Sequence, residues 1–193
     1  MSVTKINFPK VDYCLNVLNG EPFIKYQLDC LYKYANQIII VEGAYYKFSK
    51  NAKGYRSKDK TLEIINGYSD PQQKIKILAE NRFYNDRLEM CNVFMDYLKG
   101  DILWQIDVDE FFSDYTHLEI PNLFFNNKNL DQISFLFHNC YRNSNWKIAG
   151  YQNSLTDVIR INRIKKGMKW INQRPPTLGL NGKPIIPREI LNG

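Results

Sequence analysis

The sequence contains no apolar run long enough to cross a membrane. A spanning helix needs roughly 18 consecutive apolar residues, and no such run occurs among the 193 residues. The stretch MSVTKINFPKVD at the N-terminus also lacks the apolar segment of a secretory signal. We therefore expect a soluble protein in the cytoplasm and not a helical membrane protein.

Histidine and cysteine are scarce, which argues against a zinc cage. The chain has two histidines and four cysteines, and no two cysteines form a C-x-x-C pair. Cys14, Cys30 and Cys91 fall inside apolar patterns. They are therefore predicted to be buried free thiols, as suits a reducing compartment.

The apolar content and the basic segments of the chain fit one globular domain that binds an anionic ligand. Apolar residues make up 44% of the chain, enough for one core, so we expect a single domain over 1–193. The formal net charge is +6, and segments 44–60 and 160–174 each carry six basic residues. Such segments favour phosphate-like ligands, although each also fits a solvated loop.

Hydrophobic periodicity predicts an α/β fold with a mostly parallel sheet. The first half reads β-α-β-loop-β-α-β, which implies right-handed crossovers. After residue 112 the pattern becomes irregular, with a short helix in THLEIPNLFF and a turn-rich tail. The predicted strands are 11–18, 37–43, 74–78, 101–109, 131–143 and 157–164, and the predicted helices are 24–36, 61–66 and 84–98.

Three carboxylates stand at the tip of the fourth strand, in DILWQIDVDEFF. Ligands of open α/β sheets bind beyond the carboxyl ends of the strands. In extended chain Asp107 and Asp109 project to one side and offer two carboxylates to one hard cation, Mg²⁺ or Mn²⁺. The alternative is a solvated turn whose acids cap a helix at Ser113 or Asp114. The metal hypothesis requires that these carboxylates face a cavity and are not tied up with arginines.

Several segments together resemble the glycosyltransferases of the GT-A fold, family-two type. They are NVLNGEPFIKYQLDCL, IIIVEGA, NDRLEMCNVF and DILWQIDVDEFF, with a W-x-x-x-R-P-P-T-L stretch at 170–178. The resemblance implies a Rossmann-like three-layer sandwich with a mostly parallel central sheet. It also implies a nucleotide-sugar-binding half at 1–112 and an irregular acceptor-side half at 113–193.

The resemblance assigns roles to individual residues. It places Asn19 and Glu21 in the base and ribose pocket, Glu42 against the nucleobase, Arg87 and Asn92 near the base and diphosphate, Asp107 on ribose or metal, and Asp109 on the metal. Other interpretations stay open for three of them: Asn19 is equally a turn residue, Glu42 a solvated strand end, and Arg87 a surface partner of Asp86 or Glu89.

The general base and the third metal ligand are harder to assign. Inverting relatives place the base well after the acidic motif, where Asp157 is the best candidate, although a strand-capping role fits it too. Glu110 either acts on the sugar or supports the metal. The third metal ligand of such relatives, often a histidine, comes later still, and the chain has only His117 and His138. We therefore expect either a fragment truncated at its C-terminus or a shortened acceptor half. Trp146, Tyr151 and Trp170 suit either sugar stacking or core packing.

The favoured function is metal-dependent transfer of a sugar, with inversion, from a nucleotide-diphosphate donor to a hydroxyl of a saccharide or glycolipid. A UDP-sugar is the favoured donor, and polysaccharide biosynthesis at the cytoplasmic membrane face is the favoured setting.

The alternatives are an inactive nucleotide-sugar-binding domain and a basic nucleic-acid-binding module. The nucleic-acid module is disfavoured because most aromatic residues occupy apolar periodic positions. A sugar-nucleotidyltransferase is disfavoured because no glycine-rich loop follows the first strand. The oligomeric state is left open.

Overall fold

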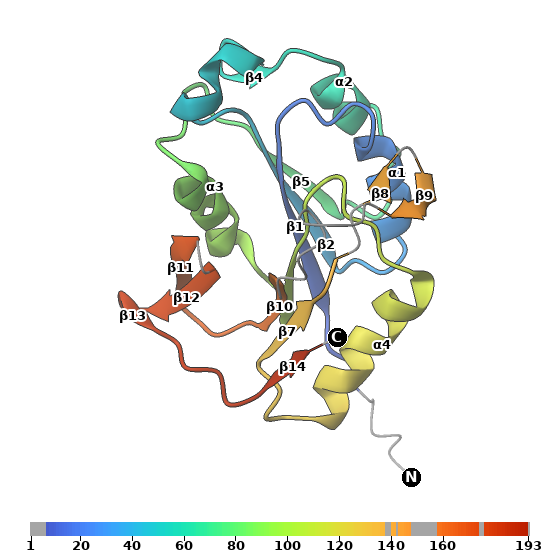
Figure 1. Cartoon of the computed structure of the whole chain (residues 1–193), viewed down its shortest axis with the longest axis vertical. Coiled ribbons are helices and arrows are strands. Elements are labelled where there is room, and N and C mark those ends of the chain that lie inside the picture. Colours follow the sequence, from blue (N-terminus) through green and yellow to red (C-terminus); the bar gives the residue numbers. More distant parts are fainter. Residues whose placement is uncertain (1–6, 138–139, 142, 148–157, 174–175, 193) are drawn as a thin grey trace.

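The chain is built around a seven-stranded sheet (Figure 1). The computed structural model describes residues 7–137, 140–141, 143–147, 158–173 and 176–192. The strand order is β14-β7-β10-β6-β1-β2-β5. Among these strands only β10 runs antiparallel to its neighbours β6 and β7. The strands are β1 (Val11–Val17), β2 (Gln37–Glu42), β5 (Ile75–Leu78), β6 (Ile102–Gln105), β7 (Gln132–Phe135), β10 (Val158–Arg163) and β14 (Ile190–Asn192).

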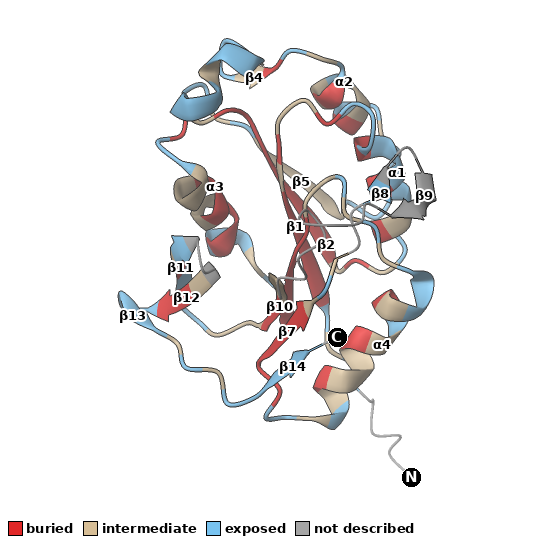
Figure 2. Ribbon diagram, viewed as in Figure 1, coloured by how far each residue is buried: buried red, intermediate tan, exposed pale blue. Residues whose placement is uncertain are grey.

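Layers of other elements cover both faces of this sheet, as Figures 1 and 2 show. One core packs the sheet against α1 (Ile24–Leu31), α2 (Thr61–Asn66) and α4 (Asp114–Asn126). The second core packs the other face against α3 (Arg87–Val93), the 3-10 helix η2 (Phe94–Tyr97) and a small sheet. That small sheet contains β11 (Met168–Gln173), β12 (Pro176–Leu180) and β13 (Lys183–Pro184). The predicted three-layer α/β architecture is confirmed.

Short elements complete the described chain. The loop after β2 holds the 3-10 helix η1 (Tyr46–Asn51) and the hairpin of β3 (Ala52–Lys53) and β4 (Arg56–Ser57). A second hairpin pairs β8 (Cys140–Tyr141) with β9 (Asn143–Lys147). No helix in the described part of the chain is long and apolar enough to span a membrane.

Central strand β2 shows why the parallel sheet could be predicted. All six residues of its sequence QIIIVE are buried, because β1 and β5 flank it and both faces are covered. A strand buried on both faces reads as a continuous β-branched run. The prediction of a strand at 37–43 is confirmed, and the short helix predicted at 61–66 is present with the same bounds.

Several predicted elements differ from the structure; in particular, the strand predicted over 131–143 is β7, which ends at Phe135. Helix α1 ends at Leu31 and not near residue 36, because the backbone amide of Asn36 already donates to Val11 in the sheet. The helix predicted over 84–98 begins only at Arg87, after Asp86 caps it by accepting from the amide of Glu89, and it becomes a 3-10 helix after Val93. The tail predicted to be rich in turns, from residue 172 on, contains the end of β11 and the strands β12, β13 and β14.

Candidate functional site

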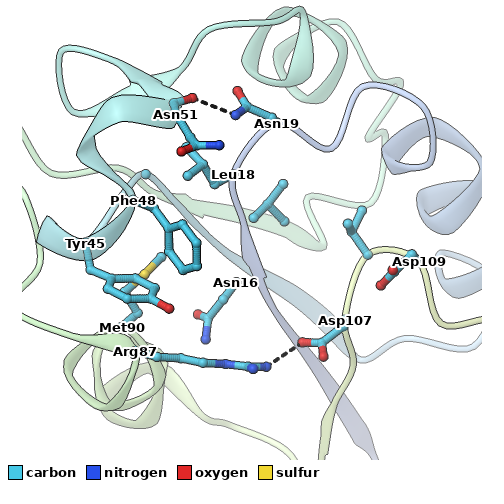
Figure 3. A pocket seen from close by; sticks show the side chains of 13 residues that line it. Asn16, Leu18, Asn19, Tyr45, Phe48, Asn51, Arg87, Met90, Asp107 and Asp109 are labelled. Carbon is cyan, nitrogen blue, oxygen red and sulfur yellow. Dashed lines mark hydrogen bonds and ion pairs between the residues drawn. The ribbon is translucent and has the colours of Figure 1, made fainter. Parts of the chain in front are cut away.

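A cavity of 470 Å³ opens where the carboxyl ends of the parallel strands meet (Figure 3). This volume lies in the range of roughly 300–1,000 Å³ that small-molecule sites occupy. Its walls come from the ends of β1 and β2, from η1, from α3 and from the turn after β6. The lining residues are Asn16, Val17, Leu18, Asn19, Gly43, Tyr45, Phe48, Asn51, Arg87, Met90, Asp107, Val108 and Asp109.

The acidic segment after β6 forms a turn. Strand β6 ends at Gln105, and the backbone amide of Glu110 donates to the carbonyl of Asp107 at 3.0 Å. The prediction that the strand extends through Asp109, with two carboxylates projecting side by side, is therefore wrong. Asp107 and Asp109 nevertheless both line the cavity, but in different electrostatic environments.

Asp107 is bound by two arginines. Nη2 of Arg87 lies 2.8 Å from its Oδ1, and Nη2 of Arg160 lies 3.0 Å from its Oδ2. Arg87 thus pairs with neither Asp86 nor Glu89, the surface partners considered from the sequence. Asp107 faces the cavity, as the metal hypothesis requires, but it is paired with two arginines, so the second condition of that hypothesis is not met at Asp107. Each carboxylate oxygen carries two lone pairs, so each keeps one.

Glu110 contacts both Arg160 and the backbone of the acidic turn. Its Oε1 accepts from Nη2 of Arg160, and its Oε2 accepts from the backbone amide of Asp107 at 3.1 Å. Burial raises the pKa of Glu110, although the charge of Arg160 opposes this shift. Glu110 is not among the residues that line the cavity. The geometry makes it a partner of Arg160 and of the acidic turn.

Asp109 is the available carboxylate of the turn. It is exposed and lines the cavity, and within the described residues nothing forms a hydrogen bond or ion pair with its side chain. The described part of the chain holds no group of three metal-ligating side chains. Mg²⁺ and Mn²⁺ are, however, commonly held by one or two carboxylates together with substrate phosphates. Asp109, with the remaining lone pairs of Asp107, fits such a site.

Asn19 and Glu21 follow β1 and contact the loop that carries η1 and the β3/β4 hairpin. Asn19 has a positive φ of 54°, and its Nδ2 donates to the carbonyl of Asn51 at 2.7 Å. Its turn geometry and its place in the cavity wall are therefore compatible. Glu21 lies outside the cavity lining, where its Oε2 accepts from the amide of Lys60 at 2.9 Å.

Glu42 is fully buried at the end of β2, so the alternative of a solvated strand end is wrong. Its Oε1 accepts from the amide of Ser57 at 2.7 Å. Nη1 of Arg56 lies 3.6 Å from Oε2, which has no hydrogen-bond partner among the residues that the structure describes. Glu42 lies next to the cavity-lining Gly43 but does not itself line the cavity.

Asn92 joins α3 to the small sheet. Its Nδ2 donates to the carbonyl of Trp170 at 2.8 Å, and its Oδ1 accepts from the amide of the same residue at 2.8 Å. Neither residue lines the cavity, and Trp170 is buried in the second core, as the core-packing alternative expected. Asp157, Tyr151 and the side chain of Trp146 lie outside the described residues.

Most residues of the cavity wall were not predicted from the sequence, and four unpredicted side chains matter for the chemistry of the site. Asn16, Tyr45 and Phe48 line the cavity, and Arg160 reaches the acidic turn from the antiparallel strand β10. The rings of Tyr45 and Phe48 are 4.9 Å apart and nearly perpendicular, at 82°. The aromatic-rich segment AYYKF, directly after the second strand, is the sequence signal that could have identified this wall.

Comparisons with known proteins identify the fold. The sequence matches no protein-family model and no curated protein. The structure is similar to the mannosyltransferase PcManGT from Pyrobaculum calidifontis in complex with GDP-Man and Mn²⁺, with a TM-score of 0.51 and 16% identity over 72% of this chain. It is also similar to S. aureus TarS 1–349, with a TM-score of 0.54 and 14% identity over 73% of this chain. The complex of TarS 1–349 with UDP gives a TM-score of 0.52 and 16% identity.

These likenesses confirm the GT-A fold that the sequence resemblance implied. This chain spans 37% of the length of the PcManGT chain and 38% of the length of the TarS 1–349 chain.

Proposed function

We propose that this chain is a glycosyltransferase domain that binds a nucleotide-diphosphate sugar, preferably a UDP-sugar, in the cavity at the sheet edge. The observation that carries this proposal is the pairing of an aromatic wall with an unpaired carboxylate, Asp109, across one 470 Å³ cavity of a GT-A fold. Complexes of neighbours with GDP-Man and Mn²⁺ and with UDP support the choice of ligand.

The nucleoside belongs at the wall formed by Tyr45 and Phe48. Flat aromatic faces stack on nucleobases, and such stacking tolerates every base because each has a π-face. Asn16 has an amide oxygen without a partner among the described residues and suits the ribose or base edges, whereas both amide atoms of Asn19 already bond to the loop, through Asn51 and Lys58. Glu42 and Glu21 then hold the surrounding loop through Ser57 and Lys60.

The diphosphate belongs at the opposite end, beside Arg87, Asp107 and Asp109 (Figure 3). Asp109, with Asp107, would hold Mn²⁺ or Mg²⁺, and when bound this ion neutralises the charge that develops on the leaving diphosphate. Arg87 lies in the same wall and supplies a guanidinium to phosphate oxygens. Glu110 positions Arg160 and the turn, and it is the positioning role that we propose for it.

The acceptor belongs on the side formed by residues 113–193. A saccharide or glycolipid hydroxyl needs a carboxylate that removes its proton on the face opposite the diphosphate, which gives inversion. Asp157 is our proposed base. A glycolipid acceptor would bring the protein to the cytoplasmic face of a membrane, where polysaccharide is assembled.

Calorimetry and a hydrolysis screen test the proposal. UDP and GDP are titrated with and without MnCl₂, and a panel of UDP- and GDP-sugars is then screened for hydrolysis and transfer to simple saccharides. Metal-dependent nucleotide binding followed by hydrolysis supports the proposed enzyme. Absence of binding to both nucleotides, together with tight binding to an RNA or DNA oligomer, would overturn it.

One observation favours a second candidate, a domain that binds nucleotide-sugar without turning it over. Both carboxylate oxygens of Asp107 are bound by arginines, which leaves Asp109 as the single uncommitted acid of the turn. Tight, metal-dependent nucleotide binding without hydrolysis or transfer of any donor would support this candidate.

A further inference from the structure

The two arginines that bind Asp107 are held very differently. Arg160 is 12% exposed, contacts both Asp107 and Glu110, and its guanidinium lies 5.6 Å from the ring centre of Phe137. Arg87 is 37% exposed, and within the described ranges Asp107 is the one carboxylate that it contacts. Arg160 is therefore fixed by its surroundings, whereas Arg87 is held to Asp107 by one partly exposed ion pair, which is a weak interaction.

Arg87 also stands where it faces both candidate ligands. It lies in the cavity wall between the aromatic residues and the acidic turn (Figure 3). Its contact with Oδ1 of Asp107 places a positive charge beside one of the oxygens proposed to hold the divalent ion. Like charges at such distances repel strongly in a partly buried site. The guanidinium and the ion therefore compete for the same carboxylate.

The formal charges of the cluster add a second constraint. Arg87 and Arg160 pair with Asp107 and Glu110, and Asp109 in the same cavity wall adds an unpaired carboxylate, so the cluster has an excess of one negative charge. A diphosphate entering alone meets this excess, and a divalent cation entering alone meets two guanidinium groups. The charges therefore favour joint binding of the two ligands over binding of either one alone.

We infer that Arg87 is an exchangeable counter-ion: it neutralises Asp107 before nucleotide binds and transfers to the diphosphate when the divalent cation takes its place. This inference rests on the proposed function, since it concerns the same site. It makes Arg87 the element that couples metal and nucleotide binding. Loss of Arg87 should then change the two affinities in opposite directions.

The test is the substitution Arg87→Met, with calorimetric titration of MnCl₂ alone and of UDP and GDP at saturating MnCl₂. We expect Mn²⁺ alone to bind about tenfold more tightly, because one repelling charge is gone. We expect the nucleotide that the wild type binds to bind about tenfold or more weakly, because a charge-assisted contact is lost. Arg87→Lys, which keeps the charge, should leave the Mn²⁺ affinity near that of the wild type.

Arg82→Met is the matched control. Arg82 pairs with Glu80 and Glu89 beside the same helix, outside the cavity lining. Arg82→Met changes the net charge by the same amount as Arg87→Met, but it removes the charge outside the cavity lining. It should therefore change neither the Mn²⁺ affinity nor the nucleotide affinity more than about twofold. Thermal melting of each variant establishes that it is folded.

The outcomes separate the inference from the function on which it rests. A wild type that binds neither nucleotide with Mn²⁺ refutes the proposed function and the inference together. Normal wild-type binding with both affinities of Arg87→Met unchanged, or both weakened, overturns the inference alone. Equal effects of Arg87→Met and Arg82→Met on Mn²⁺ binding would also overturn it, because they would show a bulk charge effect.

Discussion

The two aspartates of the acidic turn should respond differently to the same substitution. Asp109→Asn changes an exposed side chain that has no hydrogen bond or ion pair among the described residues. We expect the free energy of unfolding to change by less than about 0.5 kcal/mol, as for other surface sites. Asp107→Asn removes the carboxylate that contacts Arg87 at 2.8 Å and Arg160 at 3.0 Å.

The cost of Asp107→Asn follows from these contacts. Hydrogen bonds to charged groups contribute about 1.5–3 kcal/mol each. Solvent screens the pair with Arg87, because the side chains of Asp107 and Arg87 are 30% and 37% exposed. The loss should therefore be about 2 kcal/mol in total, most of it from the more buried Arg160. For a domain of this size that lowers Tm by about 4–8 °C.

Thermal melting with and without UDP and MnCl₂ measures both effects. A ligand present at about 100 times its Kd stabilises the folded state by about 2.7 kcal/mol. Wild type should show this gain with UDP and Mn²⁺ together, and Asp109→Asn should lose it while melting like wild type in buffer. The reasoning fails if Asp109→Asn melts as low as Asp107→Asn in buffer, or if it keeps the full gain with ligand.

Three further predictions concern other parts of the molecule. Burial lowers the pKa of His117 to about 4, so protonation favours the unfolded chain. The free energy of unfolding should therefore fall by about 1.4 kcal/mol between pH 7.5 and pH 5.5. Urea denaturation at the two pH values should show a smaller fall for His117→Phe. Phe48→Ala should weaken UDP binding about fivefold or more, because stacking is lost. Tyr46→Ala should leave UDP binding unchanged, because the Tyr46 ring is 61% exposed and lies outside the cavity lining. Equal losses of affinity in calorimetry would contradict this. The Arg188 hydrogen bond holds the pKa of the buried Asp131 well below its usual range, so Asp131→Asn should lose about 2 kcal/mol, and an unchanged denaturation midpoint would refute that role.

The part of the site that depends on strand order could be predicted from the sequence. The β-branched run of β2 and the apolar run before Asp107 identify parallel strands, and the rule for open α/β sheets then places their ends around one ligand. The cavity that contains Asn19, Arg87, Asp107 and Asp109 lies at this edge. Local pattern was sufficient for this because it fixes which residues follow each strand.

The partners of these residues could not be predicted in the same way. Arg160 is 53 positions from Asp107 and reaches it because β10 runs antiparallel beside β6. Nothing in DVIRINRI marks which arginine turns to the acidic residues. Similarly, Glu42 is buried because the segment with Arg56 and Ser57 folds over it, and a strand-end acid without such a cover would be solvated.

The antiparallel strand β10 has a consequence for the order in which the acidic turn and its arginine partner form during synthesis. It inserts between β6 and β7, so the arginine that steadies the acidic turn comes from a segment synthesised some fifty residues after the turn itself. A nascent chain that ends soon after residue 112 would present Asp107 without this counter-charge and β6 with one open edge. The acidic turn would gain both of its arginine contacts only once the later strands have left the ribosome and closed the sheet.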